Sequence, residues 1–331
     1  MTTTELGPPT APPPDPTGQS APGSTRGAPA WIAQSTARRR RRTELVAVIA
    51  LRICAGVSIA VTVAIIASLA KESWGFLKEY SPVDFLTGTT WNPVGDGGGE
   101  YGVWPLISGS AMIAFGSIVV GLPLGLGAAV YLSEYAPARV RSVLKPVMEL
   151  LAGIPTVVVG FFALQVITPS ILRPLFGEDR VFVFNAAAGA LAVGVIVLPI
   201  IATVCEDSLR AVPRSLREAS YALGGSKRVT SLRVLIPAAA SGISAATILA
   251  VSRALGETMA VNIAAGNTPN LTADFFKSIQ TLTAYIAQTV GGETAAGSVR
   301  NQSLYAVGAL LFVLTLGLNM LSARIVRKLK A

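Results

Sequence analysis

An arginine and a glutamate lie four residues apart in the apolar stretch SRALGETMA, residues 252–260. No charged side chain occurs from Val234 to Ser252, and none follows Glu257 until Asp274. If this segment crosses a membrane, each lone charge near the centre costs about 2.5–3.5 kcal/mol on insertion scales. The presence of Arg253 and Glu257 in this apolar segment therefore needs a structural or functional explanation.

The pair allows two interpretations. On one helical face, Glu257 can neutralise Arg253, and the pair then locks neighbouring helices together. Alternatively, the planar guanidinium binds a translocating oxyanion through paired hydrogen bonds. Glu257 then orients the arginine and weakens its grip, so that the anion is released. Thr258 can add a hydroxyl donor to such a substrate path. Charge alone does not select phosphate over sulfate or molybdate.

The elements that carry the pair belong to a membrane protein. Of the 331 residues, 51% are hydrophobic and 14% are charged, against roughly a quarter charged in soluble domains. A span needs about 20 mostly apolar residues. We therefore predict an all-α integral membrane protein with six transmembrane helices, at 45–70, 106–132, 148–169, 183–205, 238–265 and 303–323. In the third span, Gly153-Ile154-Pro155 is expected to bend or break the helix.

The composition argues against several other functions. The chain has no histidine, the commonest general base and metal ligand. Cys54 and Cys205 lie in apolar runs and are interpreted as packing residues. A single buried carboxylate argues against an intramembrane enzyme. A channel or secondary transporter is disfavoured because we find neither an inverted repeat nor a chain of intramembrane carboxylates. We expect no catalytic residue and no metal site.

Basic residues flank the predicted spans asymmetrically. Of the 27 Lys and Arg residues, eighteen lie on the side of the two termini and six lie on the other side. By the positive-inside rule, both termini are cytoplasmic in a multi-pass protein of the cell membrane. This distribution accounts for the net charge of +9 without a nucleic-acid partner.

The N-terminal region differs in composition from the rest of the chain. Residues 1–37 are rich in Pro, Thr, Ser, Gly and Ala, and Arg38–Arg42 follow. We predict a disordered cytoplasmic arm over residues 1–43, because this composition provides no periodic apolar face. The arginine run is interpreted as a topology anchor at anionic headgroups, with a regulatory or partner-docking element as the alternative.

The loop between the fourth and fifth spans predicts an elbow. Pro213 suits the first turn of a helix, and Gly224-Gly225 suit its left-handed end. A second short helix is expected from about Lys227 to Pro237. The predicted helix–glycine–helix elbow, residues 213–237, would lie along the membrane face. An ordinary amphipathic connector is the alternative.

The elbow resembles the EAA loop of binding-protein-dependent ABC importers. The matching residues are Glu218-Ala219-Ser220, Gly224 and Val234-Leu235-Ile236-Pro237, with serine in place of alanine at the third position. In that family the short helix of the loop lies in a groove of the cytoplasmic ATPase and couples hydrolysis to channel opening. The resemblance implies this coupling role for Glu218, Ala219, Ser220, Gly224 and Pro237.

Other segments are similar to the same permease domain. They are YGVWPLISGSAMIAFGSIVVGLPLGLGAAVYLSEYAP at 101–137 and LLAGIPTVVVGFFAL at 150–164. SRALGETMA, LSEYAP and QSLYAVGALLFVLTLGLNMLS narrow the resemblance to the C-type permease subunit of phosphate-specific importers. The resemblance covers about residues 101–323 and implies the type I ABC importer permease fold. It also implies that Arg253 and Glu257 are needed for phosphate uptake.

The resemblance further implies the partners of the chain. They are a homologous second permease, a cytoplasmic ATPase dimer and an extracytoplasmic phosphate-binding protein, which would dock on segments 71–105 and 266–302. The chain lacks a Walker A pattern, so ATP and Mg are expected on the ATPase and no cofactor on this chain. An importer of sulfate, molybdate or an amino acid is the alternative.

The expected domain organisation follows from these assignments. It comprises the arm at 1–43, the first transmembrane helix with its extracytoplasmic loop at 44–100, the permease domain at 101–323 and a basic cytoplasmic tail at 324–331.

Overall fold

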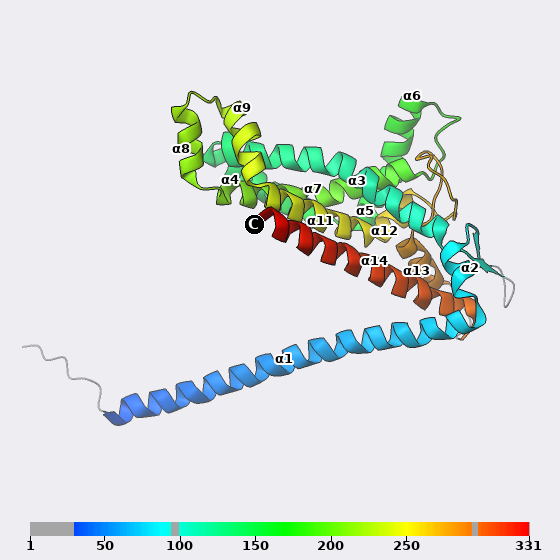
Figure 1. Cartoon of the computed structure of the whole chain (residues 1–331), viewed down its shortest axis with the longest axis horizontal. Helices are drawn as coiled ribbons and strands as arrows, with labels where there is room; N and C mark the ends of the chain where they lie inside the picture. The colour runs from blue at the N-terminus through cyan, green and yellow to red at the C-terminus, as the bar shows by residue number, and fades with distance from the viewer. Residues whose placement is uncertain (1–29, 94–98, 293–296, 331) are drawn as a thin grey trace, which may run out of the picture. The chain divides into compact units, whose positions relative to one another are not determined.

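The computed structural model describes residues 30–93, 99–292 and 297–330 of the chain (Figure 1). The chain divides into two units, Met1–Val63 and Ala64–Ala331. Helix α1 (Ala30–Glu79) begins in the first unit and ends in the second. Residues 1–29 of the predicted arm lie outside the described residues.

Helix α1 differs from the prediction at both ends. Residues 30–43, within the segment predicted to be a disordered arm, are part of this helix, and the Ala, Gln and Arg residues there favour helix. The helix also continues to Glu79, past the predicted end at residue 70. Much of the predicted extracytoplasmic loop 71–105 is therefore regular structure.

The second unit is almost entirely helical. After α1 the elements are α2 (Pro82–Thr87), β1 (Trp91–Asn92), β2 (Glu100–Tyr101), α3 (Trp104–Val130), the π-helix η1 (Tyr131–Tyr135), α4 (Ala138–Ala152), α5 (Thr156–Phe162), the π-helix η2 (Ala163–Leu172), α6 (Arg173–Phe176) and α7 (Ala186–Ala211). They continue with α8 (Arg214–Ala222), α9 (Lys227–Val229), the π-helix η3 (Thr230–Leu235), α10 (Ile236–Ala238), α11 (Ala240–Leu255), α12 (Met259–Ala264), α13 (Leu282–Gly291) and α14 (Val299–Lys330).

Length and hydropathy support five to six membrane spans in the described part of the chain. Five helical stretches are long and apolar enough on their own: Glu44–Glu79, Trp104–Tyr135, Thr156–Phe176, Ala186–Ala211 and Val299–Arg324. A sixth is available if Lys227–Ala238 and Ala240–Leu255, which meet at an angle of 72°, act as one broken span. The prediction of a helical membrane protein is confirmed.

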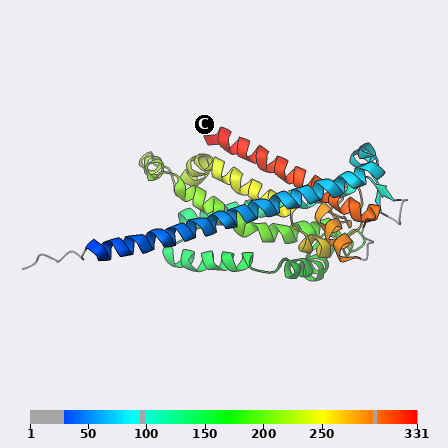
Figure 2. The same ribbon diagram turned by 90° about the horizontal axis from the view of Figure 1, so that it is seen from below.

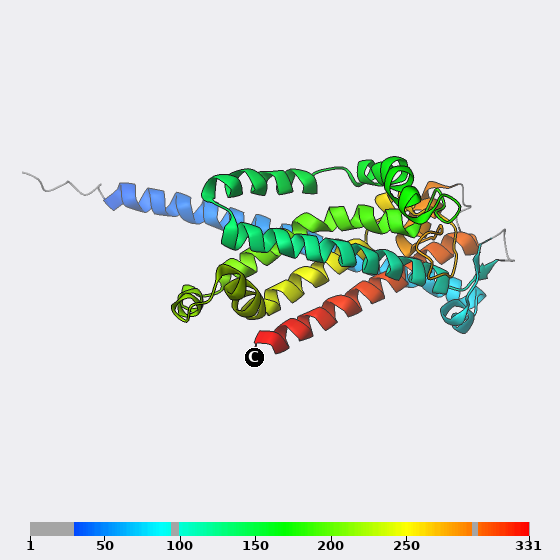
Figure 3. The same cartoon turned by 90° about the horizontal axis from the view of Figure 1, so that it is seen from above.

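The third span is broken where the Gly-Ile-Pro sequence predicted a break. Helix α4 ends at Ala152, and Gly153 caps its end. Pro155 precedes α5 in extended geometry, because proline restricts its own backbone and lacks an N–H donor. Figures 2 and 3 both show α4 and α5 as separate helices joined by this extended stretch. The apolar span therefore covers Thr156–Phe176 and not 148–169.

The fifth span is shorter than predicted. A continuous helix over 238–265 was expected, but α11 ends at Leu255 and α12 begins only at Met259. Gly256 caps α11, in keeping with the low helix propensity of glycine. The backbone of Glu257 is then held from outside, since the Thr283 hydroxyl donates to its carbonyl at 2.8 Å.

Helix α7 lies at the centre of the second unit. Its side chains Val193, Val197 and Ile201 are fully buried in a core shared with α3 and α11. Small residues permit close helix contacts, as is common among membrane helices. At Gly160 of α5, an added Cβ would lie 2.7 Å from the Cα of Ala260 in α12.

The two ends of the second unit differ in chemistry (Figure 1). At one end, an aromatic cluster of Phe76, Phe85, Trp91, Tyr101 and Tyr285 packs around the two-residue strands, which are antiparallel with Trp91 opposite Tyr101. At the other end lie α4, α8, α9 and the C-terminal part of α14. These four segments carry most of the basic residues that follow the first span.

Candidate functional site

The predicted pair in SRALGETMA forms an ion pair. Arg253 Nη1 donates to Glu257 Oε2 at 2.5 Å. Arg253 and Glu257 were predicted to lie on one helical face. This is wrong for Glu257, because α11 ends at Leu255 and Gly256 caps it. The pair therefore joins the end of a helix to a non-helical segment.

The carboxylate of Glu257 is buried and held by its neighbours. Its second oxygen, Oε1, accepts a hydrogen bond from the backbone N–H of Ala260 at 3.4 Å. The Glu257 side chain is 3% exposed, whereas the Arg253 side chain is 38% exposed. The guanidinium thus keeps free donor capacity on its open side.

The residue before Arg253 makes a polar contact with another helix. Next to Arg253, the Ser252 hydroxyl donates to Oδ1 of Asn319 in α14 at 2.9 Å, at an exposed position. Thr258 makes only a local contact in the described residues, from its hydroxyl to the Gly256 carbonyl at 3.3 Å. Ser252 and Asn319 were not predicted as site residues, and Thr258 was.

The predicted elbow is present. Pro213 precedes α8, and α9, η3 and α10 follow as the second arm. Gly224 has a φ of 80°, the left-handed conformation that glycine adopts without a steric cost. The Ser220 and Thr230 hydroxyls lie 2.8 Å apart and join the two arms.

The outer face of the elbow has few contacts within this chain. Glu218, Ala219 and Pro237 are exposed, and Leu223 at the tip is 90% exposed. An exposed leucine flanked by small residues is the kind of surface that another protein covers. The structure brings Glu218, Ala219, Ser220 and Gly224 together, with Pro237 at the far end of the second arm.

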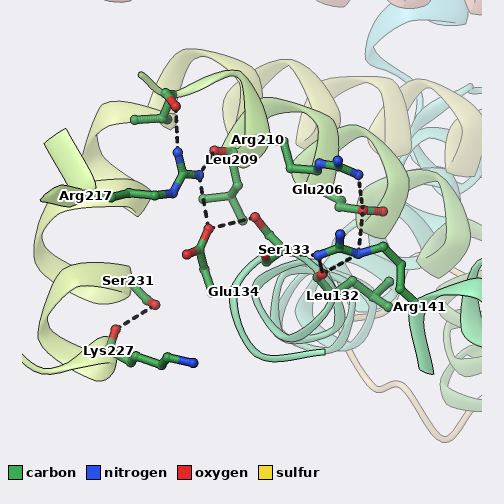
Figure 4. Close-up of polar contacts among 11 residues, drawn as sticks. Leu132, Ser133, Glu134, Arg141, Glu206, Leu209, Arg210, Arg217, Lys227 and Ser231 are labelled. Atoms are coloured by element: carbon green, nitrogen blue, oxygen red, sulfur yellow. Dashed lines mark hydrogen bonds and ion pairs between the residues drawn. The ribbon is translucent and has the colours of Figure 1, made fainter. Parts of the chain in front are cut away.

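The inner face of α8 is bound to the ends of two spans by one arginine (Figure 4). Arg217 donates to the backbone carbonyls of Leu209 and Val212, both at 2.7 Å. Its Nη2 also pairs with Oε1 of Glu134 in η1 at 3.1 Å. The elbow is thereby fixed to α7 and to the end of the second span.

A second polar cluster lies beside it. Glu206 in α7 is 1% exposed and has three cationic neighbours: Arg210 at 3.5 Å, Arg141 at 3.9 Å and Lys145 at 3.9 Å. Arg141 also donates to the carbonyls of Leu132 and Ser133. These contacts hold α4 against α7 and η1 (Figure 4).

Comparison with known proteins assigns the fold and elbow to a family. Residues 121–331 match the family described as binding-protein-dependent transport system inner membrane component. The chain belongs to this family of importer permeases. The match includes the elbow and the Arg253–Glu257 pair.

Curated relatives of this permease family cover most of the chain. A probable ABC transporter permease of Bacillus subtilis is 39% identical over 79% of this chain and 84% of its own length. The phosphate transport system permease protein PstC of Mesorhizobium japonicum is 32% identical over 82% of this chain and 84% of its own length. PstC 1 of Mycobacterium bovis is 34% identical over 74% of this chain and 81% of its own length.

A solved permease has the same fold. An inward-facing structure of the MetNI methionine ABC transporter matches 69% of this chain and 94% of its own chain, with 22% identity and a TM-score of 0.50. At this identity the likeness establishes the importer permease fold alone. The predicted fold class is confirmed.

Glu134 and Arg217 hold the elbow to the ends of the spans, and neither was predicted as a site residue. Glu134 is part of the LSEYAP motif, and Arg217 directly precedes the EAA motif. The sequence signal for this contact was a carboxylate at the end of the second span and an arginine in the loop between the fourth and fifth spans. No spacing rule joins residues so far apart in the chain. In the described residues, no group of three His, Cys, Asp or Glu side chains could hold a metal ion.

Proposed function

We propose that this chain is a permease subunit of an ATP-driven importer of inorganic phosphate and that it forms half of the translocation path. The single observation that carries the proposal is the half-exposed guanidinium of Arg253, held by a buried carboxylate in an apolar span. Relatives that are named phosphate transport permeases support the choice of phosphate.

Arg253 supplies the chemistry that a phosphate path needs. A guanidinium stays protonated at any physiological pH and presents a planar fork to the phosphate oxygens. Glu257 occupies one edge of that fork, so the remaining donors bind a passing anion only weakly. Weak binding favours release, which a permease requires.

The surface around Arg253 fits a path shared between two permeases. Ser252 and Asn319 are polar side chains that meet at an exposed position of α11 and α14, and exposing them to lipid would be unfavourable. A homologous second permease would cover this surface and leave a polar channel between the subunits. Thr258 remains a proposed donor on that path.

The remaining partners follow from the elbow. A cytoplasmic ATPase dimer carrying ATP and Mg would bind the outer face of α8, with Glu218, Ala219, Ser220 and Gly224 at the contact and Pro237 at the base. With this partner, the elbow end and both termini would be cytoplasmic. A phosphate-binding protein would dock at the opposite end, near the aromatic cluster.

Phosphate uptake tests the path directly. Cells that express the complete complex take up radiolabelled phosphate, and wild type is compared with Arg253→Gln at matched membrane levels. We expect Arg253→Gln to abolish uptake while the complex still assembles. Arg180→Gln, at an arginine outside the fifth span that lies over the Phe276 ring, is the matched control and should transport normally.

Competition identifies the anion. Excess sulfate or molybdate should leave phosphate uptake unchanged. If sulfate or molybdate inhibits phosphate uptake, or if phosphate is not taken up at all, the chain serves another oxyanion. Arginine chemistry also allows this alternative. Unchanged uptake in Arg253→Gln would contradict the path and favour a purely structural ion pair.

ATP hydrolysis is expected on the partner chain. The purified permease, free of its ATPase, should hydrolyse no ATP, and adding the ATPase should restore activity. Hydrolysis that persists after removal of every partner would contradict this assignment.

A further inference from the structure

A polar cavity lies between the elbow and the span ends. It has a volume of about 430 Å³ and is lined by Ser133, Glu134, Arg141, Arg210, Arg214, Arg217, Glu218 and Tyr221. One wall is formed by α8, and the other is formed by η1, α4 and α7. Glu218, which is also proposed to meet the ATPase, lies at the edge of this cavity.

Positive charge exceeds negative charge around this cavity. Its lining contains four arginines and two glutamates. Behind it, the buried Glu206 is matched by Lys145, so the local excess is about two positive charges. An ion or group with one to two negative charges would neutralise it.

The arginines around the cavity differ in how firmly the chain holds them. Arg217 and Arg141 donate hydrogen bonds to backbone carbonyls. These bonds fix the positions of their guanidinium groups at the cavity wall. Arg214 is exposed and forms no ion pair among the described residues. Fixed guanidinium groups bind phosphate oxygens at little cost in side-chain entropy.

We propose that this cavity binds a phosphate group, supplied by free inorganic phosphate or by the headgroup of an anionic lipid. Arg214 and Arg217 contact it from the elbow, and Arg141 and Arg210 contact it from the span ends. The bound group therefore joins α8 to α4 and α7 and restrains movement of the elbow. This site is separate from Arg253 and does not depend on which anion is transported.

Equilibrium binding to the purified whole complex tests free phosphate as the source. The complex is placed in nanodiscs of phosphatidylcholine, without the binding protein, and titrated with radiolabelled inorganic phosphate. Arg214→Gln should raise the dissociation constant about tenfold, as expected for the loss of one charge-assisted contact. Arg228→Gln removes an exposed arginine of α9 outside the cavity and should leave the constant unchanged.

Arg253→Gln separates this site from the transport path. We expect it to retain the binding that Arg214→Gln weakens. If Arg253→Gln removes the binding and Arg214→Gln does not, phosphate occupies the path alone, and the proposal is overturned. Equal losses in Arg214→Gln and Arg228→Gln would also overturn it, because they would indicate a diffuse charge effect.

A second arm tests the lipid headgroup. Hydrogen exchange of the α8 amides is compared in nanodiscs with and without phosphatidylglycerol. If the headgroup is the ligand, phosphatidylglycerol slows exchange in wild type and in Arg228→Gln but not in Arg214→Gln. If neither inorganic phosphate nor phosphatidylglycerol has an effect that depends on Arg214, the cavity is not a phosphate site.

Discussion

Arg253 and Glu257 form an ion pair of unequal exposure. The two side chains approach to 2.5 Å, but the arginine is 38% exposed and the glutamate 3% exposed. Breaking such a pair affects its members differently. Without Arg253 the carboxylate is buried and unpaired, whereas without the carboxylate the arginine can still reach water.

This asymmetry predicts the behaviour of Glu257→Gln. The amide is close in size, and its one oxygen can still accept from either Arg253 or the Ala260 N–H, so the protein should accumulate in the membrane. The arginine loses its counter-charge and holds phosphate more tightly, so release becomes slow. We expect the maximal rate of phosphate uptake to fall at least tenfold at matched protein levels. Glu178→Gln, at an exposed glutamate, is the control. Wild-type uptake in Glu257→Gln would contradict the release role.

Arg217 should be irreplaceable by lysine. Its guanidinium donates to two carbonyls and one carboxylate at once, a geometry that a single ammonium cannot reproduce. We expect Arg217→Lys to destabilise the docking of α8 by about 1.5–3 kcal/mol, the range for hydrogen bonds to charged groups. Hydrogen exchange of the α8 amides should accelerate accordingly. Arg228→Lys provides the matched control. Equal protection of the α8 amides from exchange in both variants would contradict the role of Arg217 in holding α8.

Gly224 should be needed for coupling because of its backbone conformation. An alanine at a φ of 80° costs about 1–2 kcal/mol. Gly297 has a φ of 86° and, like Gly224, has no atom within 4 Å of an added Cβ. Gly297→Ala therefore imposes a similar backbone cost away from the elbow. We expect only Gly224→Ala to reduce phosphate uptake per ATP hydrolysed, and a similar loss in both would argue against the coupling role.

Gly160 should be needed for packing next to the ion pair. The nearest atoms to an added Cβ are backbone atoms of Ala260, at 2.7–3.2 Å, and backbone cannot move aside as a side chain can. Overpacking of this kind costs about 1–3 kcal/mol. We expect Gly160→Ala to lower the thermal unfolding temperature of the purified complex. Gly127→Ala, where an added Cβ meets nothing within 4 Å, should not lower it.

Local sequence signals were sufficient to predict the elbow and most of the spans. Pro213 and Gly224 act on their own backbone, and long apolar stretches require a membrane whatever their neighbours are. The break after Leu255 was missed because the hydropathy of the segment continues across it. What holds the Glu257 backbone out of the helix is a hydroxyl from Thr283 on another element.

Tertiary contacts also explain the missed polar residues. Glu206 directly follows the predicted fourth span, 183–205, and its cations in α4 come from an earlier loop. Ser252 and Asn319 gain importance only because α11 and α14 are adjacent. A single sequence contains no rule that pairs such positions.

The surroundings of Glu206 bear on how the chain is assembled in the membrane. A carboxylate that is 1% exposed and left without its cations costs about 3–5 kcal/mol. Two of those cations belong to α4, which is synthesised earlier but is not itself a buried helix. The third cation, Arg210, lies on α7 itself, so the carboxylate keeps one counter-charge whatever the position of α4. Docking of α4 supplies the other two, and the charge of this buried group thereby favours a closed inner end of the bundle.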